Sequence, residues 1–74
     1  MGKSLVSNNI RTLRFHHEEM TQQQLADEAG VTRQTIIAIE SAKYSPSLEL
    51  AFRIALAFNV KLEEVFTYEP ETKK

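Results

Sequence analysis

The chain has 74 residues, a formal net charge of −1 and no cysteine. This length fits one small domain, and the lack of cysteine excludes disulfides and thiolate metal sites. No apolar run approaches the ~20 residues that span a bilayer, and the N-terminal segment MGKSLVSNN lacks the apolar core of a signal peptide. We therefore expect a cytoplasmic protein with no membrane partner.

The first two predicted helices lie in the N-terminal half of the chain. The first covers about residues 8–18, where Ile10, Leu13 and His17 recur on one face at i, i+3 and i+7. The second begins after Thr21, which starts the capping-box pattern T-x-x-Q, and ends at a glycine that permits a left-handed turn.

Three further helices are predicted after this glycine. Thr32 caps a third helix that runs to about Ser41. Pro46 interrupts the pattern, and Ser47 caps a fourth helix, LELAFRIALAFN, which is apolar nearly all round. A short fifth helix follows at residues 62–66.

Strand signals are almost absent, so the predicted class is all-α. We expect one domain over residues 8–66, between a flexible N-terminal extension over residues 1–7 and a charged tail over residues 67–74. Within this scheme, Phe66–Tyr68 could pair as a short strand in an oligomer.

The fourth helix has more apolar surface than one core contact needs. Its predicted inner face holds Leu48, Ala51, Ile54, Ala55 and Phe58. Phe52 and Leu56 lie on a second face, so either the fifth helix and the tail cover them or they form a subunit interface. The candidate interface residues are Phe52, Leu56, Phe66 and Tyr68.

The third helix has an outer face that packing does not explain. At about 100° per residue, Arg33, Gln34, Ile37 and Ala38 fall on the side away from the apolar stripe. Arginine can donate two hydrogen bonds to guanine, glutamine can pair with adenine, and an isoleucine can touch a thymine methyl. The alternative is a solvated face with an incidental isoleucine.

Gln22, Ala26 and Gly30 follow one another at intervals of four. A small residue at position 26 lets two helices cross closely, and Gly30 allows a short turn, which together are typical of a helix-turn-helix unit. The segments NIRTLR, MTQQQLADEAGVTRQTIIAIE, SAKYSPSLEL and IALAFNVKLEEVF resemble the Cro/CI-type (XRE-family) helix-turn-helix domains. The resemblance implies a five-helix, lambda-repressor-like domain. It also implies that the protein binds double-stranded DNA in the major groove as a transcriptional regulator, and more specifically as a repressor.

This resemblance also implies roles for individual residues. The implied base contacts are Arg33 and Gln34, with Thr32, Ile37 and Ala38 nearby. The implied phosphate contacts are Gln22, Thr35, Ser41, Lys43 and Tyr44. An ion pair between Arg14 and Glu40 would fix the reading helix, since Glu40 lies at the edge of the buried face and needs a partner; Arg11 is the alternative partner.

One segment departs from the family. RFHHEEM, between the first two helices, is one residue longer than the usual turn and has no glycine. Either the first helix runs further or the turn is unusual.

Other patterns predict no chemistry. Gly2-Lys3-Ser4 lacks the upstream glycine and strand of a phosphate-binding loop. His16-His17-Glu18-Glu19 contains metal-ligand residue types, but neighbours on a helix point about 100° apart and no i, i+4 histidine pair exists. We expect no cofactor, no metal and no catalysis.

The partners follow from this interpretation. We expect a homodimer on an inverted-repeat operator, because one reading helix covers few base pairs and half-sites recur at ~34–36 Å. The alternative is an antitoxin-like interaction module whose main role is to bind a partner protein. The apolar fourth helix and the aromatic residues near position 66 favour that alternative.

Overall fold

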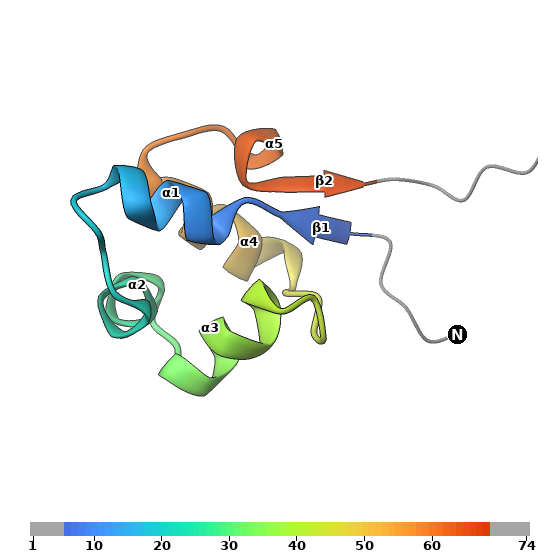
Figure 1. Cartoon of the computed structure of the whole chain (residues 1–74). Helices are drawn as coiled ribbons and strands as arrows, with labels where there is room; N and C mark the ends of the chain where they lie inside the picture. The colour runs from blue at the N-terminus through green and yellow to red at the C-terminus, as the bar shows by residue number, and fades with distance from the viewer. Residues whose placement is uncertain (1–5, 69–74) are drawn as a thin grey trace, which may run out of the picture.

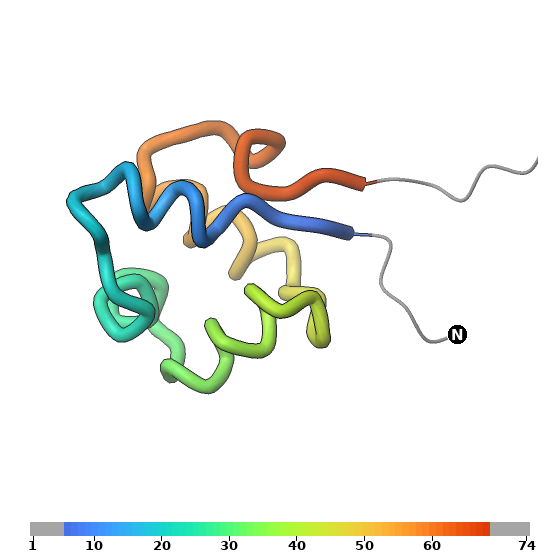
Figure 2. The backbone as a smooth tube through the Cα atoms, in the orientation of Figure 1, coloured from blue at the N-terminus to red at the C-terminus, as the bar shows by residue number. Residues whose placement is uncertain are grey.

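The computed structural model describes residues 6–68, in which five helices and two short strands surround one apolar core (Figure 1). In chain order these elements are β1 (Val6–Asn8), α1 (Ile10–His16), α2 (Gln22–Ala29), α3 (Arg33–Glu40), α4 (Leu48–Phe58), α5 (Leu62–Val65) and β2 (Phe66–Tyr68). The backbone trace in Figure 2 places α3 and α5 on opposite sides of the molecule. The helices confirm the predicted all-α class.

A small β-ladder closes the described chain on itself. Val6 lies opposite Tyr68 and Asn8 lies opposite Phe66 in an antiparallel pair. The sequence suggests pairing of the C-terminal segment in an oligomer, whereas the structure shows it pairing within one chain. The folded unit therefore extends beyond residues 8–66 at both ends. Two β-branched residues and two aromatic residues suit a pleated ladder, but a local pattern cannot reveal a strand whose partner lies at the other end of the domain.

The predicted helix starts are confirmed by their caps. Thr21 Oγ1 accepts from the Gln24 amide at 3.0 Å, and Gln24 Oε1 accepts from the Thr21 amide at 2.8 Å. Thr32 and Ser47 each accept from the amide three residues on, at 3.2 and 3.1 Å. Each cap satisfies an amide that has no acceptor within its own helix.

The turn between α1 and α2 is unusual, which is one of the two alternatives that its sequence allows. The helix ends at His16, two residues before the predicted end, and Glu18 and Glu19 have φ values of 57° and 55°. Two successive non-glycine residues thus take the left-handed conformation that glycine normally provides, at a cost of roughly 1–2 kcal/mol each. Arg14 stabilises the turn through two hydrogen bonds to the main chain of Met20. The Arg14 carbonyl accepts from the Met20 amide, and Arg14 Nη1 donates to the Met20 carbonyl, both at 2.9 Å.

The inner face of α4 differs by one residue from the prediction. The buried residues are Leu50, Ala51, Ile54, Ala55 and Phe58, whereas Leu48 is 67% exposed. Leu48 is the first residue of the helix and lies at the edge of the buried arc, in line with Phe52 and Leu56 at i+4 and i+8. The second face is also open, because Phe52 is 53% and Leu56 is 76% exposed. The fifth helix and the C-terminal strand therefore do not cover it.

Left-handed residues give a direct stability test. Ala42 has a φ of 64°, so we expect Ala42→Gly to raise the free energy of unfolding by about 0.5–1 kcal/mol, because relief of strain exceeds the added entropy of the unfolded chain. The matched control is Ala57→Gly inside α4. It should lower the free energy of unfolding by about 1 kcal/mol, because glycine is a poor helix former. Urea titrations measure both. A loss of stability at position 42 would contradict this account of the loop.

Candidate nucleic-acid interface

Helices α2 and α3 form a tight two-helix unit. Gly30 ends α2 with a φ of 76°, and the Val31 amide donates to the Ala26 carbonyl at 3.0 Å. Ala26 has no exposed surface, so the small residue lies inside the helix crossing. A Cβ at position 30 would lie 3.3 Å from Arg53 Nη1, which adds a steric reason for glycine to its left-handed backbone.

Helix α3 divides into a buried and an open face. Ile36 is fully buried and Ile39 is 1% exposed, which matches the predicted inner stripe. Arg33 and Gln34 are exposed at its N-terminal end. The candidate base-reading residues lie on the open side, with Thr32 exposed and Ile37 and Ala38 half-buried. This face presents the guanidinium donors of Arg33 and the side-chain amide of Gln34, a donor and an acceptor, beside a small apolar surface.

The candidate phosphate-contact residues differ in whether their side chains already have a hydrogen-bond partner in the protein. Lys43 and Tyr44 are exposed in the loop after α3. Ser41 Oγ donates to the Ala38 carbonyl at 3.2 Å, and Thr35 Oγ1 lies 3.1 Å from Thr32 Oγ1. The hydroxyls of Ser41 and Thr35 therefore already have a partner in the protein.

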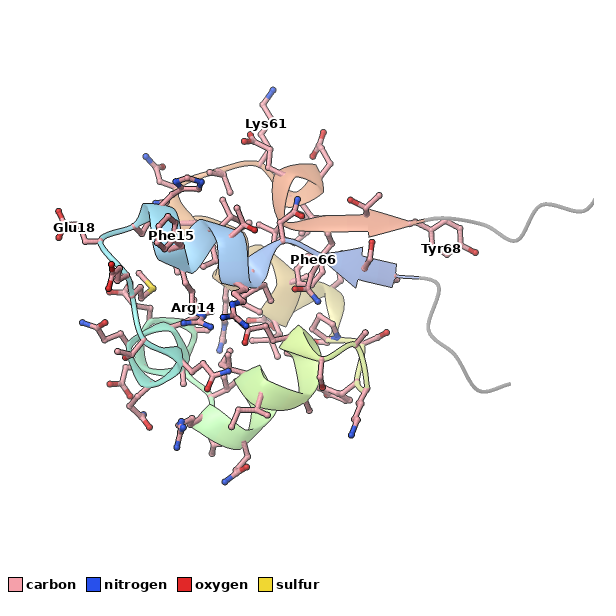
Figure 3. All side chains as sticks on the ribbon, viewed as in Figure 1. Arg14, Phe15, Glu18, Lys61, Phe66 and Tyr68 are labelled. Carbon is pink, nitrogen blue, oxygen red and sulfur yellow. The ribbon has the colours of Figure 1, made fainter. Side chains whose placement is uncertain are left out.

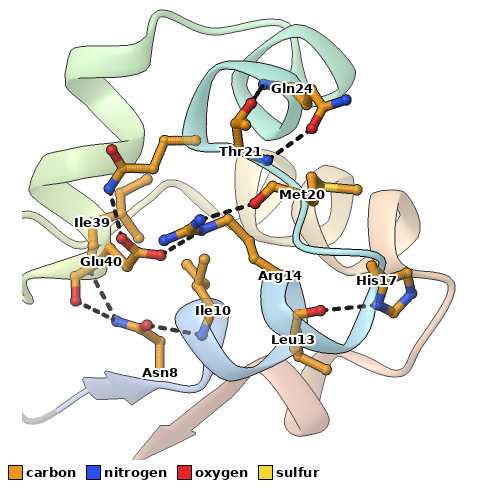
Figure 4. Close-up of polar contacts among 11 residues, drawn as sticks. Asn8, Ile10, Leu13, Arg14, His17, Met20, Thr21, Gln24, Ile39 and Glu40 are labelled. Carbon is orange, nitrogen blue, oxygen red and sulfur yellow. Dashed lines mark hydrogen bonds and ion pairs between the residues drawn. The ribbon is translucent and has the colours of Figure 1, made fainter.

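A polar network joins the first three helices (Figure 4). Arg14 Nε on α1 donates to Glu40 Oε2 on α3 at 2.8 Å, and Gln22 Nε2 on α2 donates to Glu40 Oε1 at 2.7 Å. The side chains of Arg14 and Glu40 are 18% and 13% exposed. Each carboxylate oxygen thus takes one strong bond with little access to water. The network fixes the C-terminal end of α3 against α1 and the start of α2.

The side chain of Gln22 is not free to contact a phosphate in the way that the resemblance implies. Its side-chain amide nitrogen is bound to Glu40. The first amides of a helix have no acceptor within that helix. Thr21 satisfies the amides of Gln24 and Leu25 through its hydroxyl and its carbonyl. The main-chain amides of Gln22 and Gln23 are therefore the ones left without an acceptor in α2. These two amides, rather than the side-chain nitrogen, are the donors that the start of α2 can offer to an anion.

Asn8 is a positioning residue that the sequence patterns missed. Its Nδ2 donates to the Ile39 carbonyl at 3.0 Å, and its Oδ1 accepts from the Ile10 amide at 3.1 Å. The Asn8 side chain therefore bonds to the first amide of α1 and to a carbonyl at the C-terminal end of α3. An asparagine just before an apolar helical face is a local capping signal, but its bond to α3 spans 31 residues.

A hollow of about 880 Å³ lies between α1, the α1–α2 turn, the start of α2 and the start of α3. Arg11, Arg14 and Arg33 line it, together with Gln22 and Gln23. Arg14 is paired with Glu40, so Arg11 and Arg33 are the cations that lie open in this hollow. Guanidinium groups beside a helix N-terminus favour an anion. From the sequence patterns, Arg11 had only the role of a rival partner for Glu40.

His17 is part of the packing around α4. Its Nδ1 lies 2.9 Å from the Leu13 carbonyl, its Nε2 lies 3.0 Å from the Phe58 carbonyl, and its ring meets the Phe58 ring edge-on at 5.2 Å. Across residues 6–68, no group of three or more histidine, aspartate or glutamate side chains is placed to hold a metal ion. Over the same stretch, no helix is long and apolar enough to cross a membrane.

Comparison with known proteins identifies the family. The Helix-turn-helix family model matches residues 10–65. An uncharacterized HTH-type transcriptional regulator of Methanocaldococcus jannaschii is 52% identical over 66 residues, covering 89% of this chain and 98% of its own length. A protein with the same description from Bacillus subtilis is 44% identical over 66 residues, with 89% and 98% coverage.

A solved structure has the same fold. The crystal structure of a Bacteroides fragilis protein that is named for DNA binding superposes with a TM-score of 0.73 at 26% identity, over 84% of this chain and 98% of that one. Proteins of this family are not enzymes. On the family match, the sequence identities and the α2–α3 unit together, the chain belongs to the helix-turn-helix family as a small XRE-type protein.

Proposed function

We propose that this protein is a transcriptional regulator that places α3 in the major groove of double-stranded DNA. The observation that carries this proposal is the open face of α3, where Arg33 and Gln34 are exposed although the opposite face is fully buried. The relatives named as HTH-type transcriptional regulators support the same role. The proposed base-reading residues are Thr32, Arg33, Gln34, Ile37 and Ala38.

Contacts to the DNA backbone would orient the reading helix. The candidates from the sequence are Gln22, Thr35, Ser41, Lys43 and Tyr44. Because the side chains of Gln22, Thr35 and Ser41 already have partners in the protein, we propose that the main-chain amides at the start of α2, Lys43 and Tyr44 make the main contacts, together with Arg11 in the adjoining hollow. The acidic residues Glu63 and Glu64 belong to α5, away from α3 (Figure 1), so their charges face away from the bound duplex.

The proposed assembly is a homodimer on an inverted repeat, acting as a repressor in the cytoplasm. One α3 covers few base pairs, and two-fold pairing would place two copies ~34–36 Å apart on one side of the duplex. Because the protein carries a net charge of −1, we expect base contacts to supply a large share of the affinity. The salt dependence should then be shallow, since its slope follows the number of phosphates neutralised.

The test of this function is selection from random duplex DNA by the purified protein, followed by binding to single-base variants of the selected site. We expect Arg33→Ala to cost about 1–3 kcal/mol at one base position and to relax the preference there, because arginine bonds two acceptors of one guanine. Fluorescence anisotropy with the selected duplex measures the change.

The control for this prediction is Arg53→Ala. Arg53 lies on α4 and binds Glu49 and the Ala29 carbonyl, so its removal should leave base preference unchanged. Equal binding of wild-type protein to all four bases at the assigned position would reject the role of Arg33.

A second candidate function is binding of a partner protein. The observation in its favour is the open stripe on α4, where Phe52 and Leu56 are 53% and 76% exposed. Folded protein that enriches no duplex in the selection would favour this function over DNA reading.

A further inference from the structure

Three leucine and phenylalanine side chains form an open stripe along α4. Leu48, Phe52 and Leu56 are 67%, 53% and 76% exposed and follow one another at intervals of four. Residues at this spacing lie on one helix face. The two ends of the stripe lie in different surroundings, and this difference decides which end is suited to a partner.

Leu48 borders an apolar hollow of about 320 Å³. Its lining comes from β1, the α3–α4 loop, α4, α5 and β2, and includes Val6, Pro46, Ala51, Leu62 and Phe66. Within the described part of the chain, the lining consists of apolar residues and one serine. We call Leu48 and this hollow the Leu48 patch.

Leu56 has a different neighbourhood. The hollow beside it, of about 290 Å³, is lined in part by Glu28 and Arg53. Arg53 also pairs with Glu49 on the same helix at 2.9 Å. A surface that presses on this end of α4 must therefore accommodate Glu28 and Arg53, whereas the lining of the hollow beside Leu48 contains no charged residue.

The Leu48 patch is complementary to itself. In a two-fold interface the same surface of both copies meets, so a projecting group and a hollow that receives it must lie in one patch. Leu48 projects and the adjacent hollow is apolar. The lining of the hollow carries no charged residue and the neighbouring Glu49 is paired with Arg53, so two copies can meet there with little repulsion between like charges. The hollow also offers no charge by which an oppositely charged partner would be selected.

The β-ladder enlarges this patch. Tyr68 lies directly opposite Val6, so both side chains leave the same face of the ladder. Tyr68 is 62% exposed and points away from the helices (Figure 3). An aromatic side chain beside Val6 therefore adds area toward the roughly 800 Å² per partner that stable interfaces bury.

The patch also leaves the reading face open. Its lining residues belong to elements other than α1, α2 and α3, and the loop after α3 leads directly to it. A second copy at this position would leave the open face of α3 uncovered.

We propose that a second copy of this chain docks on the Leu48 patch, with Leu48 of each copy in the hollow of the other. This inference rests on the proposed dimeric function and names the surface that forms the dimer. It moves the centre of the interface from Phe52 and Leu56 to Leu48, while Phe66 and Tyr68 remain part of it.

The test compares two leucines of the same helix. Leu48→Glu and Leu56→Lys each place one charge on an exposed position, and each charge has the sign that its end of the helix favours. Thermal unfolding followed by circular dichroism verifies that both variants fold. Sedimentation equilibrium of the wild type and both variants, over a wide concentration range, then gives the dimer dissociation constants.

We expect Leu48→Glu to raise the dimer dissociation constant by roughly a hundredfold or more, because each dimer would lose two buried leucines and gain two buried charges. Leu56→Lys should dimerise like the wild type. A monomeric wild type, a dimeric Leu48→Glu, or dissociation by Leu56→Lys would each overturn the proposal.

A duplex with one half-site separates this inference from the proposed function. Leu48→Glu should bind it as tightly as the wild type does, since α3 is unchanged. Failure of the wild type to bind any selected duplex would reject DNA reading, while the sedimentation results would still decide the docking surface.

Discussion

Replacing Phe58 by alanine is expected to lower the free energy of unfolding by about 3–5 kcal/mol, the usual cost of truncating a buried phenylalanine. Phe58 is 1% exposed and is among the largest fully buried side chains. Its ring also meets the His17 ring at 5.2 Å, so the variant loses an aromatic contact as well as buried area. At roughly 0.05–0.15 kcal/mol per residue, a domain of 74 residues has about 4–11 kcal/mol of stability, so this one change removes a large share of it.

Urea unfolding at a fixed protein concentration measures this effect, because the stability of a dimer depends on concentration. The matched control is Phe52→Ala, on the same helix but 53% exposed. Measured where the chain is monomeric, the control should change stability by less than about 1 kcal/mol. Equal losses from the two variants would contradict the placement of Phe58 in the core and Phe52 on the surface.

Replacing Glu40 by glutamine is expected to lower the free energy of unfolding by about 1.5–3 kcal/mol, as for other hydrogen bonds to charged groups. The variant keeps the size of the side chain but leaves the charge of Arg14, 18% exposed, without its carboxylate. The bond from Gln22 is weakened at the same time. Because these contacts hold α3 against α1 and α2, binding to the selected duplex should weaken as well.

The control for this charge effect is Glu49→Gln. Glu49 pairs with Arg53 at 2.9 Å, almost the same distance, but the two side chains are 78% and 51% exposed. Water and salt screen this pair, so its loss should cost at most about 0.5 kcal/mol. Similar losses at positions 40 and 49 would show that burial does not govern the strength of the two pairs.

A double-mutant cycle with Arg14→Met isolates the pair itself. If the Arg14–Glu40 contact acts as a unit, the sum of the losses in unfolding free energy of the two single variants should exceed the loss of the double variant by about 0.5–3 kcal/mol. Additive losses would mean that each side chain stabilises the domain through its other partners, such as the Met20 carbonyl for Arg14.

Features that depend on neighbours in the chain follow from the amino-acid sequence alone. The caps at Thr21, Thr32 and Ser47 and the left-handed Gly30 each involve contacts within three or four residues. The two faces of α3 follow from helical spacing. For this reason local patterns suffice to predict the helix-turn-helix unit and its open face.

Other features required the tertiary structure because their partners are distant in the sequence. Val6 pairs with Tyr68, and Asn8 reaches the Ile39 carbonyl, across 62 and 31 residues. Leu48 lies at the edge of the buried arc, and it stays open because no described element covers that side of α4. A short-range pattern specifies which face of an element is apolar. Only packing of the whole chain decides which apolar residues are buried and which remain available to a second molecule.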